Sequence, residues 1–214
     1  MKGAFITFEG VEGAGKTSRS RALCKSLSDL GFEVMPTREP GGTPVSERIR
    51  DILLDTGLVT PPACELMLFL AARAANVEQM VTPWLLKGAV VLGDRFTDAT
   101  LAYQAFGRGL ARGDVETACA FAAAGIVPDL TVLLDLDPEL GLERHASAGR
   151  TPDRMEEAGA PFHRRVREGY LQLSRENPDR FMVLDGKLPP ERLDDLILRR
   201  TLQVLREKNG GLVR

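Results

Sequence analysis

The segment GVEGAGKT, residues 10–17, sets the architecture expected for the rest of the chain. It fits the pattern G-x-x-x-x-G-K-[ST], whose glycines let the backbone curl so that its N–H groups point at phosphate oxygens. In such a loop the lysine reaches the β- and γ-phosphates of a nucleotide, and the hydroxyl residue can ligate Mg²⁺. The expected phosphate-binding residues are Gly10, Val11, Glu12, Gly13, Ala14, Gly15, Lys16 and Thr17.

The segments on either side of this loop fit a strand and a helix. Residues 4–8, AFITF, form a short apolar run that is typical of a buried parallel strand. After the loop, Leu23, Leu27 and Leu30 recur at helical spacing, which predicts one buried face, and Gly31 follows as a helix stop. Because a helix N-terminus adds N–H donors and a favourable dipole, this context favours an anion site over a chance match in a glycine turn.

The remaining chain repeats the alternation of strand and helix. Further strands are expected at residues 32–37, 89–93, 130–135 and 181–185. The first half of the segment 63–86 is apolar nearly all round, which predicts a buried helix, and Asp114 is expected to cap a helix that runs to Gly125. This order predicts an α/β fold, a doubly wound parallel five-stranded sheet with helices on both faces. The whole chain, residues 1–214, is expected to be one domain.

Composition excludes several classes of protein. The chain has 214 residues, of which 43% are hydrophobic and 27% charged, enough for a sizeable core. A net charge of −2 argues against a nucleic-acid surface. The three cysteines lack metal-site spacing, and no 18 apolar residues run together. The first residues lack the charged and apolar regions typical of a secretory leader, so none is expected. A cytoplasmic protein without a membrane partner is expected.

Charged residues follow two of the expected strands. Arg38 and Glu39 precede the turn PGG, and Asp94 and Arg95 come directly after the strand at 89–93. Ligands bind at the carboxyl edge of an open parallel sheet, so these side chains are candidates for a site. Asp94 has the place of a Walker-B acid that orients Mg²⁺, and Arg95 would face the same phosphates. The PGG turn alone fits an ordinary loop equally well.

Two helical faces carry groups suited to a nucleotide base. Phe69 and Arg73 stand at i and i+4, so that a ring and a guanidinium share one face of a buried helix. Thr100, Tyr103 and Gln104 group in the same way on the segment 97–106. A core phenylalanine and an ordinary half-exposed helix are the structural alternatives to a base pocket.

The segment SAGRTPDRMEEAG, residues 147–159, has little apolar content and carries Arg150 and Arg154. It is either a solvated loop or a lid that brings arginine onto a transferring phosphate. His145 and His163 flank this segment, and neither is expected to be catalytic.

With these residues identified, the chain resembles bacterial thymidylate kinases almost from end to end. The resemblance rests on FEGVEGAGKT (8–17), TREPGGT (37–43), FLAARAANV (69–77), GDRFTDATLAYQAFGRG (93–109), PDLTVLLDLDPELGLER (128–144), DRME (153–156) and FHRRVREGYL (162–171). It implies a nucleoside-monophosphate kinase with an Arg-bearing lid, which transfers the γ-phosphate of ATP to dTMP with Mg²⁺, giving dTDP and ADP for dTTP biosynthesis. It also implies a homodimer.

The resemblance further implies roles for individual side chains. For the acceptor nucleotide they are Phe69 and Arg73 at thymine, Thr100 and Gln104 beside the base, Tyr103 against deoxyribose, Arg38 and Arg95 at the phosphate, and Glu12 at the 3′-hydroxyl. Around the transferring phosphoryl group they are Lys16, Arg95, Arg150 and Arg154, with Thr17 and Asp94 at the metal. The phosphate loop contains no arginine, so the lid would supply one, and which of its two arginines does so stays open.

Two other functions fit the loop alone. One is a kinase for another nucleotide, and the other is a P-loop NTPase switch that hydrolyses its nucleotide and signals through its loops. The sequence contains neither the NKxD nor the DxxG pattern of GTPase switches, and a switch would have no use for the base and sugar residues.

Overall fold

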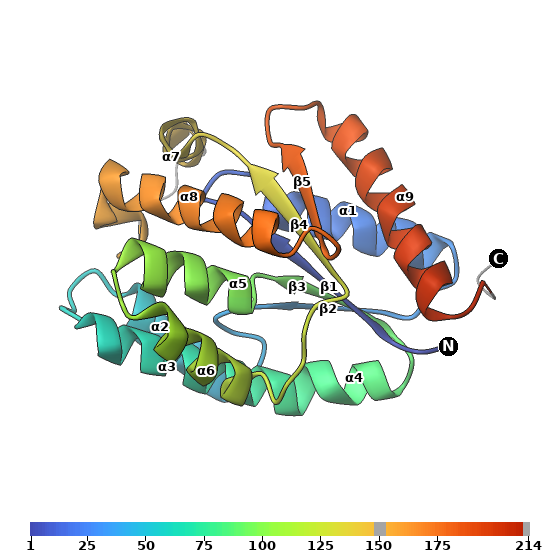
Figure 1. Cartoon of the computed structure of the whole chain (residues 1–214), viewed down its shortest axis with the longest axis horizontal. Coiled ribbons are helices and arrows are strands. Elements are labelled where there is room, and N and C mark those ends of the chain that lie inside the picture. The colour runs from blue at the N-terminus through green and yellow to red at the C-terminus, as the bar shows by residue number, and fades with distance from the viewer. Residues whose placement is uncertain (148–152, 212–214) are drawn as a thin grey trace.

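Helices cover both faces of one parallel sheet (Figure 1). The computed structural model describes residues 1–147 and 153–211. Within them the strands are β1 (Ala4–Glu9), β2 (Val34–Arg38), β3 (Val90–Asp94), β4 (Leu130–Asp135) and β5 (Phe181–Asp185). Their order across the five-stranded sheet is β2-β3-β1-β4-β5, and every pairing is parallel. The predicted doubly wound sheet is therefore confirmed.

The carboxyl ends of the strands bring the predicted polar residues to one edge. Phe8 on β1 is in register with Asp94 on β3, and Asp94 is in register with Arg38 on β2. The phosphate loop leaves β1 directly after Glu9. From β1 the chain passes to β2 and β3 on one side of β1 in the sheet, and it then crosses to β4 and β5 on the other side of β1. The carboxyl end of β1 is therefore at a topological switch point, where such sheets bind ligands.

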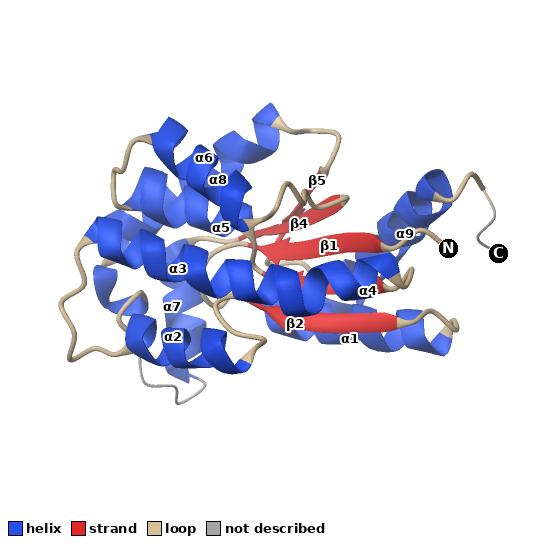
Figure 2. Ribbon diagram, turned by 90° about the horizontal axis from the view of Figure 1, so that it is seen from below, coloured by secondary structure: helices blue, strands red, loops and turns tan. Residues whose placement is uncertain are grey.

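The helices form a layer on each face of the sheet. On one face lie α1 (Lys16–Asp29) and α9 (Pro190–Lys208), and along the other runs the continuous segment α3 (Pro62–Asn76), η1 (Val77–Val81) and α4 (Thr82–Leu86) (Figures 1 and 2). The remaining helical elements are α2 (Pro44–Leu54), α5 (Thr97–Thr100), η2 (Leu101–Gly107), α6 (Arg112–Ala122), α7 (Pro138–Ser147), η3 (Glu156–Ala158) and α8 (Ala160–Glu176). Among the described residues, none of these helices is long and apolar enough to cross a membrane.

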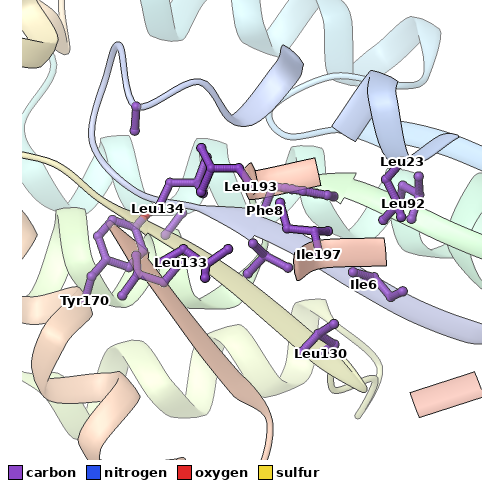
Figure 3. Packing of buried hydrophobic residues seen from close by; sticks show 14 of the residues in the cluster. Ile6, Phe8, Leu23, Leu92, Leu130, Leu133, Leu134, Tyr170, Leu193 and Ile197 are labelled. Carbon is purple, nitrogen blue, oxygen red and sulfur yellow. The ribbon is translucent and has the colours of Figure 1, made fainter. Parts of the chain in front are cut away.

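Alternate residues of β1 pack on opposite faces, as the pleat of a strand requires. Ile6 belongs to the larger core cluster, together with Leu23 of α1 and Ile197 of α9 (Figure 3). Phe5 packs on the other face in a separate cluster that includes Val81 of η1. Both faces of the central strand are buried, which explains its continuous apolar sequence.

The helices differ from expectation in three places. The segment 63–86 is one continuous helical rod, but its middle, η1, is π-helical. Asp114 lies in the first turn of α6, which begins at Arg112, so it does not cap that helix. The periodicity also predicts Leu30 on the buried face of α1, whereas its exposed fraction is 56%, because α1 ends at Asp29 and Leu30 follows as its C-cap.

Replacing Leu27 by alanine should lower the free energy of unfolding by about 2–5 kcal/mol, because the side chain is fully buried and its truncation leaves a cavity. Leu30→Ala, at the end of the same helix, is the matched control and should change that free energy by less than about 0.5 kcal/mol. Urea unfolding followed by circular dichroism measures both. Equal losses in the two variants would contradict this assignment of the buried face.

Candidate functional site

A cavity of about 780 Å³ opens at the carboxyl edge of the sheet. It is lined by the phosphate loop on one side and by α3 and η2 on the other. The sequence-predicted residues that line it are Glu12, Gly13, Gly15, Lys16, Thr17, Arg38, Phe69, Arg73, Asp94, Arg95, Thr100, Tyr103 and Gln104. Residues predicted from separate segments of the chain therefore share one cavity.

The phosphate loop packs closely against α7. Gly13 has φ of 69°, in the left-handed region that favours glycine. A methyl group on Gly13 would overlap the carbonyl oxygen of Gly141 on α7, and one on Gly141 would overlap the carbonyl oxygen of Glu12. Gly13 is thus required both by the backbone conformation and by this contact. Gly15, with φ of 93°, leads directly into α1.

Lys16 lies at the first position of α1 and folds back over the loop. Its Nζ donates hydrogen bonds to the carbonyl oxygens of Gly10 at 3.0 Å and Val11 at 2.8 Å. Burial and the neighbouring Arg95 guanidinium lower the pKa of Lys16 to about 8. Three nearby carboxyl groups offset this lowering only in part: Glu12, Asp94 and Glu9. A bound polyphosphate would add negative charge beside the ammonium group, so the loop is suited to an anionic ligand.

Thr17 and Asp94 form the candidate metal site. The Thr17 hydroxyl donates to Oδ2 of Asp94 at 2.5 Å, which places a hydroxyl and a carboxylate side by side at the mouth of the loop. Hard oxygen ligands of this kind suit Mg²⁺, which is bound by one or two protein groups plus phosphates and waters rather than by an all-protein cage. Among the described residues, no group of three or more His, Cys, Asp or Glu side chains is placed to hold a metal ion.

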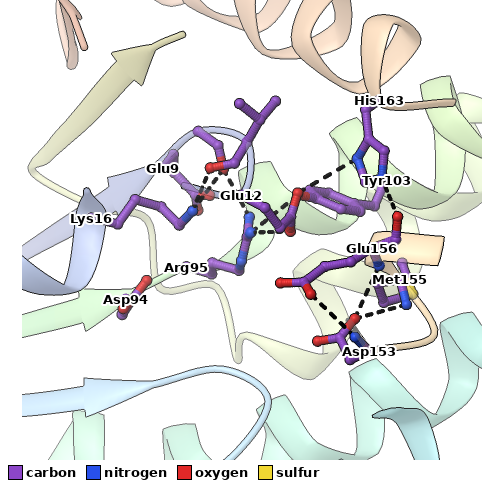
Figure 4. Close-up of polar contacts among 12 residues, drawn as sticks. Glu9, Glu12, Lys16, Asp94, Arg95, Tyr103, Asp153, Met155, Glu156 and His163 are labelled. Carbon is purple, nitrogen blue, oxygen red and sulfur yellow. Dashed lines mark hydrogen bonds and ion pairs between the residues drawn. The ribbon is translucent and has the colours of Figure 1, made fainter. Parts of the chain in front are cut away.

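Arg95 lines the cavity, and its side chain extends towards Glu12 of the phosphate loop (Figure 4). Its φ is 73°, a left-handed conformation that a non-glycine residue adopts at a cost. Its Nη2 donates to Oε1 of Glu12 at 2.7 Å and to the Tyr103 hydroxyl at 3.0 Å. Its Nη1 donates to the Tyr170 hydroxyl at 3.0 Å and to the carbonyl oxygen of Gly10 at 3.1 Å. The guanidinium is therefore held in place beside the phosphate loop.

Two carboxylates beside Arg95 titrate in opposite directions. For Glu12, burial alone would raise the pKa, but Arg95 and Lys16 outweigh it and lower the pKa to about 2. For Glu9, burial and the nearby Asp98 raise the pKa to about 8. Glu9 accepts hydrogen bonds from the Tyr170 hydroxyl and the Phe96 amide, both at 2.7 Å. Glu12 is thus the ionised acceptor that faces the cavity.

The far end of the cavity is built around a buried ion pair. Arg73 on α3 donates from Nε to Oε2 of Glu39 at 2.8 Å and from Nη2 to the Thr100 hydroxyl at 2.8 Å. Burial alone would lower the pKa of Arg73, but Glu39 raises it, so the guanidinium stays charged. Half-buried Phe69 lines the cavity on the same helix. A planar ring, a fixed cation and a hydroxyl together suit a heterocyclic base.

Arg38 is positioned at the rim of the cavity. Its Nη2 donates to Oε2 of Glu47 at 2.6 Å, and Oε1 of Glu47 accepts from the amide of Gly42 at 2.8 Å. The first contact draws the guanidinium towards the start of α2, and the second fixes the PGG turn. The turn therefore has a structural role as well as a place in the candidate site.

Of the two arginines predicted for the lid, Arg154 belongs to the described residues, and it does not lie at the phosphate loop. Arg150 lies outside the described residues. Arg154 is absent from the lining of the cavity, and it donates to Oε2 of Glu65 at 2.7 Å and to the carbonyl oxygen of Leu53 at 2.9 Å. The structure therefore places Arg154 against α2 and α3, and its predicted contact with a transferring phosphate stays a prediction.

Several site residues are missed by sequence reasoning. The lining includes Arg50, Arg144 and Asp153, for which no role is expected. His163, which is not expected to be catalytic, also belongs to the site, because its Nδ1 lies 3.5 Å from Oε2 of Glu12. Its Nε2 lies 3.2 Å from the carbonyl oxygen of Glu156, so this ring connects the end of the lid segment to the phosphate loop (Figure 4). Single polar residues such as these carry no local spacing signal.

The chain is similar to known proteins over most of its length. The family model for thymidylate kinase matches residues 8–197. A thymidylate kinase from Pelobacter propionicus is 46% identical over 207 residues, which cover 94% of this chain and 94% of that protein. One from Deinococcus radiodurans is 47% identical over 193 residues, covering 90% and 93%. The crystal structure of thymidylate kinase from Ehrlichia chaffeensis superposes with a TM-score of 0.75 at 29% identity, covering 94% and 99%.

The raised pKa of Glu9 predicts how the free energy of unfolding depends on pH. Folded Glu9 keeps its proton up to about pH 8 whereas the ordinary value is 4.5, so the folded state binds the extra proton between these limits. The contribution of Glu9 to the free energy of unfolding is therefore greatest below pH 4.5. It is lost as the pH rises towards about 8, at up to about 1.4 kcal/mol per pH unit.

Glu9→Gln should remove this slope, because a neutral amide mimics the protonated carboxyl. Urea unfolding of both proteins across that pH range measures the difference. Parallel stability curves for the two proteins would show that Glu9 is ionised in the folded state.

Proposed function

The chain belongs to the thymidylate kinase family and transfers the γ-phosphoryl group of ATP to dTMP. We propose that the cavity at the sheet edge binds these two nucleotides end to end. The observation that carries this proposal is the continuity of the cavity. It runs from Lys16 on the phosphate loop, past Arg95, to Phe69 on α3. Its volume is within the range of small-molecule sites.

The acceptor, dTMP, would bind between α3, η2 and Arg95. Phe69 would stack on thymine while Arg73, Thr100 and Gln104 contact the base edge, and Tyr103 would pack against the deoxyribose. Glu12 is ionised at neutral pH, so it can accept a hydrogen bond from the 3′-hydroxyl. Arg38 and Arg95, which both line the cavity, would bind the acceptor phosphate.

The donor, ATP, would bind with its phosphates in the loop 10–17. Lys16 would exchange the carbonyl oxygens of Gly10 and Val11 for phosphate oxygens, and the added negative charge would raise the pKa of its ammonium group. Thr17 and Asp94 would hold Mg²⁺, since their adjacent oxygens fit its ligand preference. When bound, the ion neutralises charge on the β- and γ-phosphates.

Transfer then requires alignment and positive charge rather than a base. A phosphate monoester with a second pKa of about 6 is largely dianionic at neutral pH, so no side chain has to remove a proton from it. Arg95 would stabilise the transferring phosphoryl group because it is already oriented beside the loop. We assign the lid arginine to Arg150, and we propose Arg154 as a second lid residue that would have to leave Glu65 to act.

The remaining expectations on organisation stay proposals. We propose that residues 1–214 form one domain and that two copies form a homodimer. Supporting the dimer, large apolar side chains are exposed on the neighbouring helices α2, α3 and α6: Val45, Ile52, Met67 and Phe121. Exposed apolar groups on adjacent helices are typical of an interface. A cytoplasmic location stays a prediction from the sequence.

An assay of ADP release with dTMP, dUMP, dCMP, dGMP or no acceptor tests the function directly. We expect dTMP to give the highest kcat/KM, with dTDP as product, and we expect no turnover when Mg²⁺ is omitted. Consumption of ATP at the same rate with and without dTMP, with no diphosphate formed from it, would refute the proposed placement of an acceptor in the cavity.

Lys16→Ala should lower kcat by roughly 10²- to 10⁵-fold, because it removes a cation from the transferring phosphoryl group. Lys25→Ala is the matched control, since Lys25 lies on the same helix but is exposed and pairs with Asp29. Single-turnover kinetics separate the chemical step from product release. A single-turnover rate near that of the unmodified enzyme in Lys16→Ala would exclude this role.

A further inference from the structure

Glu65 in the first turn of α3 is a fully buried carboxylate that joins three separate segments. Its Oε1 accepts hydrogen bonds from Nε2 of Gln104 on η2 at 2.9 Å and from Nε of Arg108 at 3.1 Å. Its Oε2 accepts from Nη2 of Arg108 at 3.0 Å and from Nη1 of Arg154 at 2.7 Å. Two guanidinium groups and one amide thus converge on a single acidic side chain.

This environment keeps Glu65 ionised. Burial alone would raise the pKa of the carboxyl, but the hydrogen bonds from Arg108, Gln104 and Arg154 outweigh it and lower the pKa. An ionised carboxylate only accepts hydrogen bonds. The side-chain amide of Gln104 must therefore turn its NH₂ group towards Glu65, because its oxygen would otherwise face another acceptor without a proton between them.

The fixed NH₂ group leaves the amide oxygen of Gln104 at the other end. Gln104 lines the cavity beside Arg73 and Phe69. Within the described part of the chain, no group donates a hydrogen bond to Oε1 of Gln104. This oxygen is not among the buried polar atoms that lack a partner, so it is accessible. Because Gln104 lines the cavity and its NH₂ group is held by Glu65, its oxygen is an acceptor of fixed orientation that remains available to a ligand.

We propose that Glu65 is a positioning residue that fixes the direction of the Gln104 amide and thereby selects pyrimidines that carry a proton on ring nitrogen N3. This inference rests on the proposed function, because it takes the base end of the cavity to hold the ring of dTMP. Thymine carries a proton on N3, whereas N3 of cytosine is an acceptor. A correctly turned amide pairs with thymine and leaves two acceptors opposed with cytosine, and a site that mismatches hydrogen-bonding groups rejects a ligand strongly.

A positioning role and a purely structural role of Glu65 predict different results. A structural role predicts that loss of Glu65 weakens the binding of every acceptor nucleotide equally. A role in turning the amide predicts that selectivity between thymine and cytosine changes, and that the change requires the amide of Gln104.

The test measures the Kd values of dTMP and dCMP for the full-length protein, together with kcat and KM for dTMP. Glu65→Gln lets the neighbouring amide rotate, so the ratio of the dCMP Kd to the dTMP Kd should fall by about tenfold, with KM for dTMP affected more than kcat. Glu116→Gln is the matched control, because Glu116 also pairs with an arginine but lies exposed on α6, and it should keep the unmodified ratio.

Gln104→Met supplies the second arm of a double-mutant cycle, since it removes both ends of the amide at similar volume. In that background Glu65→Gln should leave the ratio unchanged. A ratio in Glu65→Gln equal to that of the unmodified protein, or an equal fall with and without the amide, would overturn the inference.

Glu65→Asp protects the test against loss of folding, because it keeps the negative charge beside Arg108 and Arg154 while withdrawing the acceptor from Gln104 by one methylene group. Its ratio should also fall, and a folded Glu65→Asp protein with the unmodified ratio would count against the inference. Absence of dTMP turnover in the unmodified enzyme would instead remove the proposed function. Normal turnover with unchanged selectivity in the variants would remove only the role of Glu65.

Discussion

The hydrogen bonds around the Arg95 guanidinium are the interaction on which the site depends. They connect the phosphate loop, through Glu12 and the Gly10 carbonyl, to Tyr103 on η2 and Tyr170 on α8. These contacts offset the cost of the left-handed backbone at Arg95. A transferring phosphoryl group that arrives beside Arg95 therefore meets positive charge whose orientation is already set, and little reorganisation is needed when it reacts.

Much of the fold and one half of the site could be predicted because their signals are local. The spacing of GVEGAGKT specifies a loop conformation within eight consecutive residues, and the short apolar runs mark the strands one by one. Once the strands are parallel, their carboxyl ends share an edge, which brings Arg38, Asp94 and the loop together without further information. The family resemblance adds the base-binding residues, and all of those described line the same cavity.

The partners of these residues could not be predicted, since they come from distant parts of the chain. Glu39 reaches Arg73 across the sheet edge, and Glu65 reaches Gln104 from a different helix. A single acidic residue in a helix has no pattern that distinguishes it from a solvated one. Helix ends are uncertain for a similar reason: Leu30 continues the apolar spacing of α1 although the backbone has already left the helix.

The contact between Gly13 and Gly141 has a consequence for how this enzyme can vary. Each missing side chain makes room for a main-chain oxygen of the other segment rather than for another side chain. A larger residue at either position therefore cannot be accommodated by trimming its neighbour, and no second-site suppressor among the surrounding side chains restores the fit. In a library randomised at both positions, glycine would be recovered at each of them. Transplanting the phosphate loop into another protein would require transplanting α7 with it.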